Sequence, residues 1–116
     1  MLVVEDHDEL RRLLAEFLTR RGCVVEEASD GVEALTALDR RPFDVVISDL
    51  AMPRLDGAGL WLRARADRRR QGTRWIIVSS GPPPRVITEA GLTFLAKPYE
   101  LEEVWTAVRT AVAHQD

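Results

Sequence analysis

Short apolar runs alternate with amphipathic stretches along the whole chain. Five of these runs contain almost no polar residue, which is typical of strands that are buried on both faces of a sheet. The runs are Leu2–Val4, Cys23–Val25, Val45–Ile47, Trp75–Val78 and Phe94–Ala96. A stretch with helical spacing follows each run, so the pattern predicts five strand–helix units.

The helical stretches are recognised by apolar residues three and four positions apart and by signals at their ends. Gly22 is expected to end the first helix, and Ser29-Asp30 followed by Glu33 predicts a capping box at the start of the second. The residues expected on buried helix faces are Leu10, Leu13, Leu14, Phe17 and Leu18; Val32, Leu35 and Leu38; Leu60, Trp61 and Ala64; and Leu101, Val104, Trp105, Val108 and Val112.

The segment Arg85–Ala90 is a poorer helix than the others. It follows three consecutive prolines, ends at Gly91 and carries three β-branched residues in a row. Such residues lower helix propensity because they lose side-chain freedom in a helix. The sequence therefore predicts a shortened fourth helix.

Strands without polar alternation, each followed by a helix, predict an α/β fold with a parallel sheet covered on both faces. With 116 residues and 46% hydrophobic content, the chain has room for one compact core. An open, doubly wound sheet is favoured over a closed barrel, because an α/β barrel typically needs about 250 residues. We expect a single domain over residues 1–116.

Composition excludes several classes of protein. The net charge of -3 is too small to indicate a nucleic-acid partner or an acidic tail. The single cysteine, Cys23, cannot form an internal disulfide and is expected to be a small buried hydrophobe. No apolar run approaches the roughly 20 residues of a membrane span, and Glu5 interrupts the first run too early for a secretory signal. These features predict a cytoplasmic location and no membrane partner.

Polar groups follow four of the five predicted strands. Glu5-Asp6 follows the first, Ser48-Asp49 the third, Ser79-Ser80 the fourth and Lys97-Pro98 the fifth. In an open parallel sheet, ligands bind outside the carboxyl ends of the strands. Three carboxylates crowded at that edge would repel one another unless a hard cation lies among them, and oxygen ligands with room for water suit Mg²⁺.

Each of these residues also has an ordinary structural explanation. Acidic residues after strands often cap helices or solvate loops, and a lone lysine can be placed by chance. The combination of acid pair, acid, hydroxyl and lysine at four strand ends is harder to explain in this way. Lys97 adds weight because it is the only lysine among 16 basic residues. A compact ammonium can pair with a phosphoryl oxygen as a point charge, where a forked guanidinium fits less well.

Five segments together resemble response-regulator receiver domains of two-component signalling over essentially the whole chain. They are LVVEDHDELRRLLAEFL, ASDGVEAL, DVVISDLAMPRLDG, IIVSSG and FLAKPYELEEV. The combination is specific, although no single segment would be. The resemblance implies the flavodoxin-like fold with strand order 2-1-3-4-5. The compressed fourth helix is similar to that of receiver domains attached to hybrid sensor histidine kinases.

The resemblance also implies roles for individual residues. Asp49 is expected to be the phosphoacceptor, and Asp6 the direct ligand of Mg²⁺ or Mn²⁺. Glu5 is expected to act on the metal through water. The main-chain carbonyl of Ala51 is expected to complete the protein's metal ligands.

Three further residues match the family's switch and phosphate contacts. Ser79 matches the switch hydroxyl, Lys97 the lysine that pairs with the phosphoryl group, and Phe94 the mobile aromatic residue. Pro98 is expected to follow Lys97 through a cis peptide bond. On phosphorylation, Ser79 would move toward the new oxygens and the Phe94 ring would fill the space it leaves.

The implied phosphoryl donor is a phosphohistidine on a histidine kinase or a histidine phosphotransfer protein. The domain would promote its own phosphorylation and dephosphorylation without being an enzyme. Many receiver domains dimerise through the fourth helix and its neighbours. The shortened helix therefore predicts a monomer or a weak dimer.

Two other functions compete with this interpretation. An aspartate-nucleophile hydrolase would be expected to carry a second aspartate two residues after Asp49, where this chain has Ala51. A pure interaction module would not need the retained acidic residues and Lys97.

Two further features have plain structural interpretations. The arginines at positions 63, 65, 68, 69, 70 and 74 are expected to form a solvated helix face. No aromatic platform accompanies them, which argues against direct nucleic-acid binding. His7 is expected to be a loop residue at a helix start, since one histidine does not make a metal cluster.

Overall fold

The computed structural model describes residues 1–113, so the last three residues of the predicted domain lie outside it. Within that range, five strands form one sheet in the order β2-β1-β3-β4-β5, and all adjacent strands are parallel. They are β1 (Leu2–Val4), β2 (Glu26–Ala28), β3 (Val45–Asp49), β4 (Arg74–Ser79) and β5 (Thr93–Ala96). The α/β class and the doubly wound, flavodoxin-like strand order are confirmed.

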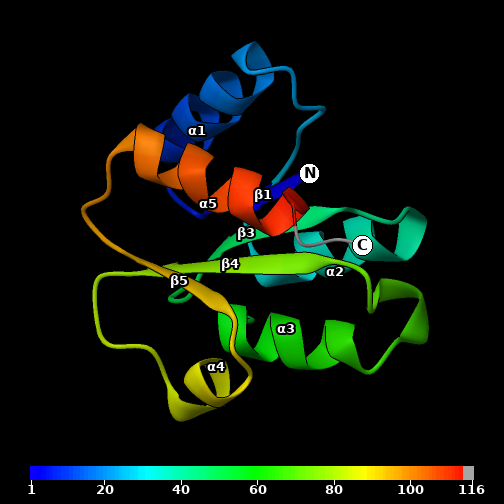
Figure 1. Cartoon of the computed structure of the whole chain (residues 1–116). Helices are drawn as coiled ribbons and strands as arrows, with labels where there is room; N and C mark the ends of the chain where they lie inside the picture. The colour runs from blue at the N-terminus through cyan, green and yellow to red at the C-terminus, as the bar shows by residue number, and fades with distance from the viewer. Residues whose placement is uncertain (114–116) are drawn as a thin grey trace.

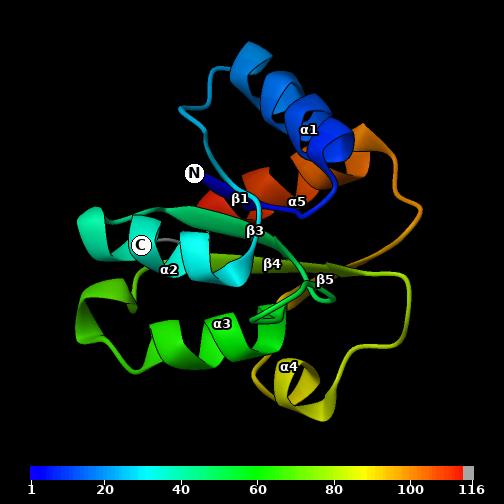
Figure 2. The same cartoon turned by 180° about the vertical axis from the view of Figure 1, so that it is seen from behind.

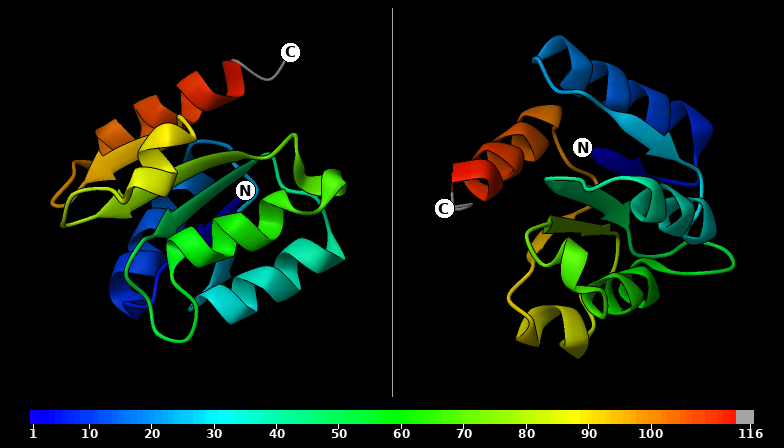
Figure 3. Two further views of the ribbon diagram at one scale, coloured as in Figure 1. Left: turned by 90° about the horizontal axis from the view of Figure 1, so that it is seen from below. Right: turned by 90° about the vertical axis from the view of Figure 1, so that its right-hand side faces the viewer.

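Helices cover both faces of the sheet. They are α1 (Asp8–Arg20), α2 (Gly31–Arg40), α3 (Gly57–Arg65), α4 (Arg85–Glu89) and α5 (Leu101–Ala113), with a short 3-10 helix, η1 (Arg68–Arg70), after α3. Figures 1 and 2 show α1 and α5 on one face and α2, α3 and α4 on the other, and Figure 3 shows the strands enclosed between these layers. With five residues, α4 confirms the predicted shortened helix. Among residues 1–113, no helix has the length and apolar character that crossing a membrane requires.

Neighbouring residues of each strand point into two separate hydrophobic cores, because side chains alternate across a sheet. In β1, Leu2 and Val4 pack on the side of α2 and α3, whereas Val3 packs on the side of α1 and α5. In β4, Ile77 packs on the side of α2 and α3, and Ile76 packs on the side of α1 and α5. The inner strands β1, β3 and β4 are therefore buried on both faces, as their apolar runs predicted, whereas the edge strands β2 and β5 are partly exposed.

The second strand begins later than the sequence predicted. Its backbone pairs with β1 only from Glu26 onward, because Glu26 lies opposite Leu2, the first residue of β1. Cys23 and Val25 come before the strand and pack, half-buried, against the core under α1 and α5, while Val24 is 83% exposed. The position of the neighbouring strand, rather than the apolar run itself, determines which residues pair.

Three apolar residues predicted on buried helix faces are exposed instead, namely Leu13, Val32 and Val112. The exposure of Val32, which lies on α2, has a geometric reason. At 3.6 residues per turn, Val32 points about 150° away from the middle of the sector that α2 buries, so it lies on the opposite side of the helix. The residues that α2 buries are Gly31, Ala34, Ala37 and Leu38.

Arg70 departs from the predicted solvated arginine face. Only 8% of this residue is exposed, and its guanidinium pairs with Asp39 of α2 and with Asp67. It turns inward because η1 lies against the end of α2, an arrangement that the local sequence does not reveal. Four other arginines of this stretch are exposed as predicted, namely Arg63, Arg65, Arg68 and Arg69. Arg74 is half-buried.

Candidate functional site

The strands bring the predicted site residues to one edge of the sheet. β1 ends just before Glu5, β3 ends at Asp49, β4 ends at Ser79, and β5 ends just before Lys97. Because these strands are parallel, all four ends face the same way. Residues that are up to 92 positions apart in the sequence therefore meet.

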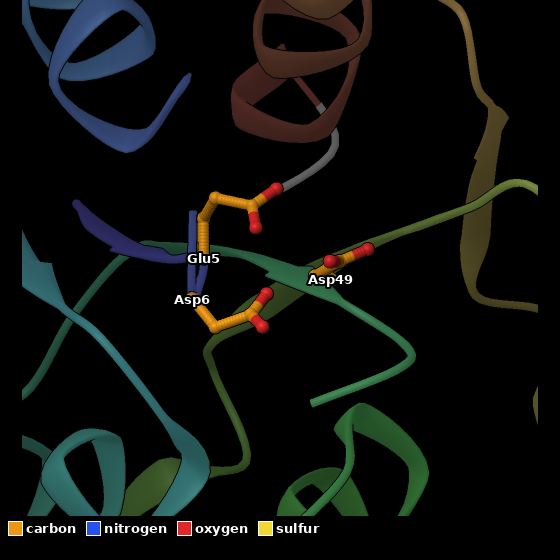
Figure 4. A group of neighbouring side chains, drawn as sticks. All are labelled: Glu5, Asp6 and Asp49. Atoms are coloured by element: carbon orange, nitrogen blue, oxygen red, sulfur yellow. The ribbon is translucent and has the colours of Figure 1, made fainter. Parts of the chain in front are cut away.

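Three carboxylates gather at this edge. Glu5, Asp6 and Asp49 each offer an oxygen, and these oxygens lie within 4.8 Å of one another. Figure 4 shows the three side chains, with Glu5 and Asp6 following β1 and Asp49 ending β3. Glu5 and Asp49 are buried, whereas Asp6 is exposed. Oxygen donors crowded in this way, with one side open to solvent, fit a hard divalent cation.

The pKa of Asp6 is affected by its surroundings at this edge. Desolvation, followed by the hydrogen bond and the charge of the neighbouring Glu5, raises the pKa of Asp6. Lys97 acts in the opposite direction but does not outweigh these effects. A positive ion among the carboxylates would relieve their mutual repulsion.

Lys97 joins the carboxylates from the other side of the site. Its Nζ lies 3.1 Å from Asp49 Oδ2 and 3.2 Å from Glu5 Oε1. Partial burial acts to lower the pKa of Lys97, but the hydrogen bonds and charges of Asp49 and Glu5 outweigh it and raise that pKa. The peptide bond from Lys97 to Pro98 is cis, as predicted.

Both carboxylate oxygens of Glu5 already have protein partners. Oε1 accepts the hydrogen bond from Lys97, and Oε2 accepts one from the backbone N–H of His7 at 3.0 Å. The action of Glu5 on a metal through water stays a prediction. His7 itself caps α1, because its Nδ1 accepts from the backbone N–H of Leu10 at 3.3 Å. The interpretation of His7 as a helix-start residue is confirmed.

The loop between β3 and α3 follows directly from the phosphoacceptor candidate. The Leu50 N–H donates to Val78 O, and the Gly57 N–H donates to Leu50 O, both at 2.8 Å. These bonds hold the two ends of the loop against the strand edge. Ala51 is exposed within the loop, two residues after Asp49, and its carbonyl as a metal ligand stays a prediction.

Ser79 and Phe94 lie on the same face of the sheet. Ile77 pairs with Phe94 and Ser79 with Ala96, so Ser79 and Phe94 lie on adjacent strands two register positions apart. Phe94 is half-buried against the core under α3 and α4. Ser79 is buried, and its Oγ accepts from the Gly81 N–H at 3.1 Å.

Arg11 is a buried residue next to the site that the sequence interpretation missed. It lies on the buried face of α1 together with Leu14 and Leu18. The spacing of 11, 14 and 18 is the spacing of a helix face. An arginine in line with two core leucines was therefore the signal that could have found it.

Comparison with known proteins supports this geometry. A family model described as the response regulator receiver domain matches residues 1–109. The chain is 32% identical over 114 residues to the transcriptional regulatory protein TcrA of Mycobacterium tuberculosis, covering 94% of this chain and 44% of that protein. The chain therefore spans less than half the length of this relative.

Two solved structures extend the likeness to three dimensions. The chemotaxis response regulator CheY4 of Vibrio cholerae superposes with a TM-score of 0.87 at 27% identity, covering 95% of both chains. The receiver domain from the hybrid histidine kinase CckA superposes with a TM-score of 0.82 at 34% identity, covering 96% of both chains. The similarity in fold therefore extends over nearly the whole chain.

Proposed function

The chain belongs to the family of response regulator receiver domains, and from this membership we propose that it takes up a phosphoryl group on Asp49. One observation carries the proposal. The Asp49 carboxylate lies 3.1 Å from the Lys97 ammonium and within 4.8 Å of the Glu5 and Asp6 carboxylates. In this arrangement, a nucleophile, the positively charged Lys97 ammonium and oxygen ligands for a metal ion surround one space.

In the proposed reaction, a carboxylate oxygen of Asp49 attacks the phosphorus of a phosphohistidine. A bond forms between this oxygen and phosphorus, and the bond between phosphorus and the imidazole nitrogen breaks. Asp49 becomes an acyl phosphate, and the imidazole of the donor is released. Because the buried Asp49 is held by Lys97, the nucleophile is positioned before the donor arrives.

The oxygen ligands fit Mg²⁺ or Mn²⁺, which we propose is bound by Asp6, Asp49 and the main-chain carbonyl of Ala51. When bound, the cation supplies positive charge that offsets the negative charge of the phosphoryl oxygens. Glu5, whose two oxygens are already engaged, holds the cation through water. Lys97 acts as a second positive charge, since its ammonium can follow the charge from the carboxylate to the phosphoryl group.

The switch in this proposal couples Ser79 to Phe94. The Ser79 hydroxyl accepts only one hydrogen bond among the interactions of residues 1–113, so it is available as a donor to a new phosphoryl oxygen. Phe94 is only half-buried and lies on the same sheet face. Inward movement of Ser79 leaves space that the ring fills, and the surface around β4 and β5 changes.

The partner in the proposal is a histidine kinase or a histidine phosphotransfer protein. The likeness to the receiver domain of a hybrid histidine kinase supports this choice. We place the reaction in the cytoplasm, where the ATP used by such kinases is available. The domain serves as a signalling acceptor rather than as an enzyme, because Ala51 stands where an acid for rapid hydrolysis would be expected.

The experiment is labelling with acetyl phosphate and Mg²⁺, followed by mass spectrometry of the intact protein. We expect about one phosphoryl group per chain on the wild type and none on Asp49→Asn. Asp56→Asn is the matched control, because it changes another aspartate of the same loop while asparagine still caps α3.

Equal labelling of the wild type and Asp49→Asn would contradict the assignment of the phosphoacceptor. Release of many phosphates per chain without accumulation of the labelled protein would indicate a hydrolase instead. Absence of labelling on the wild type would favour a pure interaction module.

A further inference from the structure

Arg11 is a buried cation whose three guanidinium nitrogens contact three different segments. Nη1 donates to the main-chain carbonyl of Glu5 at 2.9 Å. Nη2 lies 2.8 Å from Asp8 Oδ1 at the start of α1, and Nε lies 3.2 Å from Glu27 Oε1 on β2. Only 9% of Arg11 is exposed, although the Asp8 and Glu27 carboxylates that pair with it face solvent.

These contacts fix the backbone from which the acidic pair projects. The Glu5 N–H donates to Ala28 O of β2 at 3.1 Å, and the Glu5 carbonyl accepts from Arg11. Both main-chain groups of Glu5 are therefore held, one on each side of the residue. Asp6 follows immediately and is exposed, so its direction depends on how firmly this backbone is held.

We propose that Arg11 is a positioning residue for the metal site, acting through the carbonyl of Glu5. It fixes the turn between β1 and α1 so that the carboxylates of Glu5 and Asp6 face Asp49. The guanidinium contacts neither the metal nor the phosphoryl group. This inference rests on the proposed function in one respect, namely that the three carboxylates bind a divalent cation.

The electrostatic effect of Arg11 alone has the opposite sign. A positive charge near three carboxylates repels an arriving cation, so removal of that charge by itself would tighten metal binding. Removal of a positioning contact weakens metal binding, because loss of a group that orients a metal ligand typically costs about tenfold or more in affinity. The direction of the change therefore separates the two roles.

Lysine cannot replace arginine in this role. The planar guanidinium presents its nitrogens as a rigid fork toward Glu5, Asp8 and Glu27, whereas an ammonium is a single point on a flexible stem. Arg11→Lys keeps the charge and removes the fork. Arg12 provides the matched control, because it is the next residue, is exposed, and has no hydrogen bond or ion pair of its side chain among residues 1–113.

The test is titration of Mg²⁺ into the metal-free domain by isothermal calorimetry, at a temperature where circular dichroism shows every variant folded. We expect Arg11→Met to raise the Kd for Mg²⁺ about tenfold. Arg11→Lys is expected to raise it as well, by a smaller factor. Arg12→Met is expected to leave the Kd unchanged or to lower it slightly.

A Kd for Arg11→Lys equal to that of the wild type would overturn the proposal, as would tighter binding by Arg11→Met. If Arg11→Met fails to fold, Arg11→Lys alone decides the question, because it retains both the charge and most of the stem. A wild type that binds no Mg²⁺ would contradict the proposed metal site itself. Binding by the wild type that is unaffected in either Arg11 variant would contradict only the role of Arg11.

Discussion

Gly57 shows how a single position lets a helix approach the strand end that carries Asp49. A Cβ added at this position would lie 2.5 Å from the carbonyl oxygen of Asp49 and 3.0 Å from the Cα of Leu50. Both are backbone atoms, so no side chain can rotate away to relieve the contact. The absence of a side chain at Gly57 thus allows α3 to begin directly against the end of β3.

Replacement of Gly57 by alanine is expected to lower the free energy of unfolding by about 2 kcal/mol, because the new methyl group displaces either α3 or the Asp49 backbone. Urea denaturation followed by circular dichroism measures this change. Gly72→Ala is the matched control, since nothing lies within 4 Å of a Cβ at position 72. Equal effects of the two substitutions would show that the close approach at Gly57 carries no energetic cost.

Lys97 illustrates what the sequence could reveal about one residue and what it could not. Its place after the fifth strand and its status as the only lysine predicted a role at the site. The structure adds a bond to Glu5 besides the one to Asp49. No local pattern contains this second partner, because it depends on how closely the ends of β1 and β5 approach the end of β3.

At the scale of elements, the start of α2 is tied to the loop after Asp49. Asp30 is the N-cap of α2 and accepts from the Glu33 N–H at 2.8 Å. Its other carboxylate oxygen pairs with Arg54, a loop residue with a left-handed backbone at φ 69°. The hydrogen bond from Glu33, followed by that from Arg54, lowers the pKa of Asp30. The charged form of Asp30 is therefore favoured by folding.

The lowered pKa of Asp30 predicts how the stability of the fold depends on pH. A carboxyl group with a lowered pKa in the folded state contributes stability above its unfolded pKa, about 3.9 for aspartate, and loses it as the pH falls through the folded value. Asp30→Asn retains an N-cap but loses the charge, so we expect it to be less stable than the wild type by about 1 kcal/mol at pH 7. The difference should shrink as the pH falls below about 4.

Urea denaturation between pH 7 and pH 3 measures this difference. Glu9→Gln is the control for the loss of one exposed carboxylate, because Glu9 has no ion pair among the described residues. A gap between the wild type and Asp30→Asn that stays constant over the whole range would contradict the lowered pKa of Asp30.

At the scale of the whole molecule, the connection between β4 and β5 contains only a short helix. α4 has five residues, and Ile87 is its only buried one. Such a short helix offers little area for a partner, because stable protein interfaces bury about 800 Å² on each side. We therefore predict that the face formed by α4, β5 and α5 does not support a strong dimer.

We expect the domain to stay monomeric or weakly dimeric after addition of a phosphate mimic with Mg²⁺. Light scattering over a range of protein concentrations measures the mass, and the Asp49→Asn variant serves as a control that does not take up the mimic. A tight dimer that forms only with the mimic and only in the wild type would show that the shortened α4 does not prevent association.

The sequence by itself determined the fold class, the strand order by resemblance, the short fourth helix and the polar residues at the ends of four of the five strands. These features are encoded locally, since apolar runs specify buried strands and β-branched residues with prolines disfavour a helix. Parallel strands then send their ends to one edge whatever the details of packing. For this reason Glu5, Asp6, Asp49, Ser79 and Lys97 could be assigned to one site without coordinates.

Only the tertiary structure decided where β2 begins, that Val32 faces solvent, and that Arg11 and Arg70 turn inward. Each of these depends on a neighbour that is distant in the chain. β2 begins where β1 offers backbone partners, and a buried arginine needs acidic or carbonyl partners from other segments. Local patterns carry no information on such partners, because burial and pairing are properties of the assembled fold.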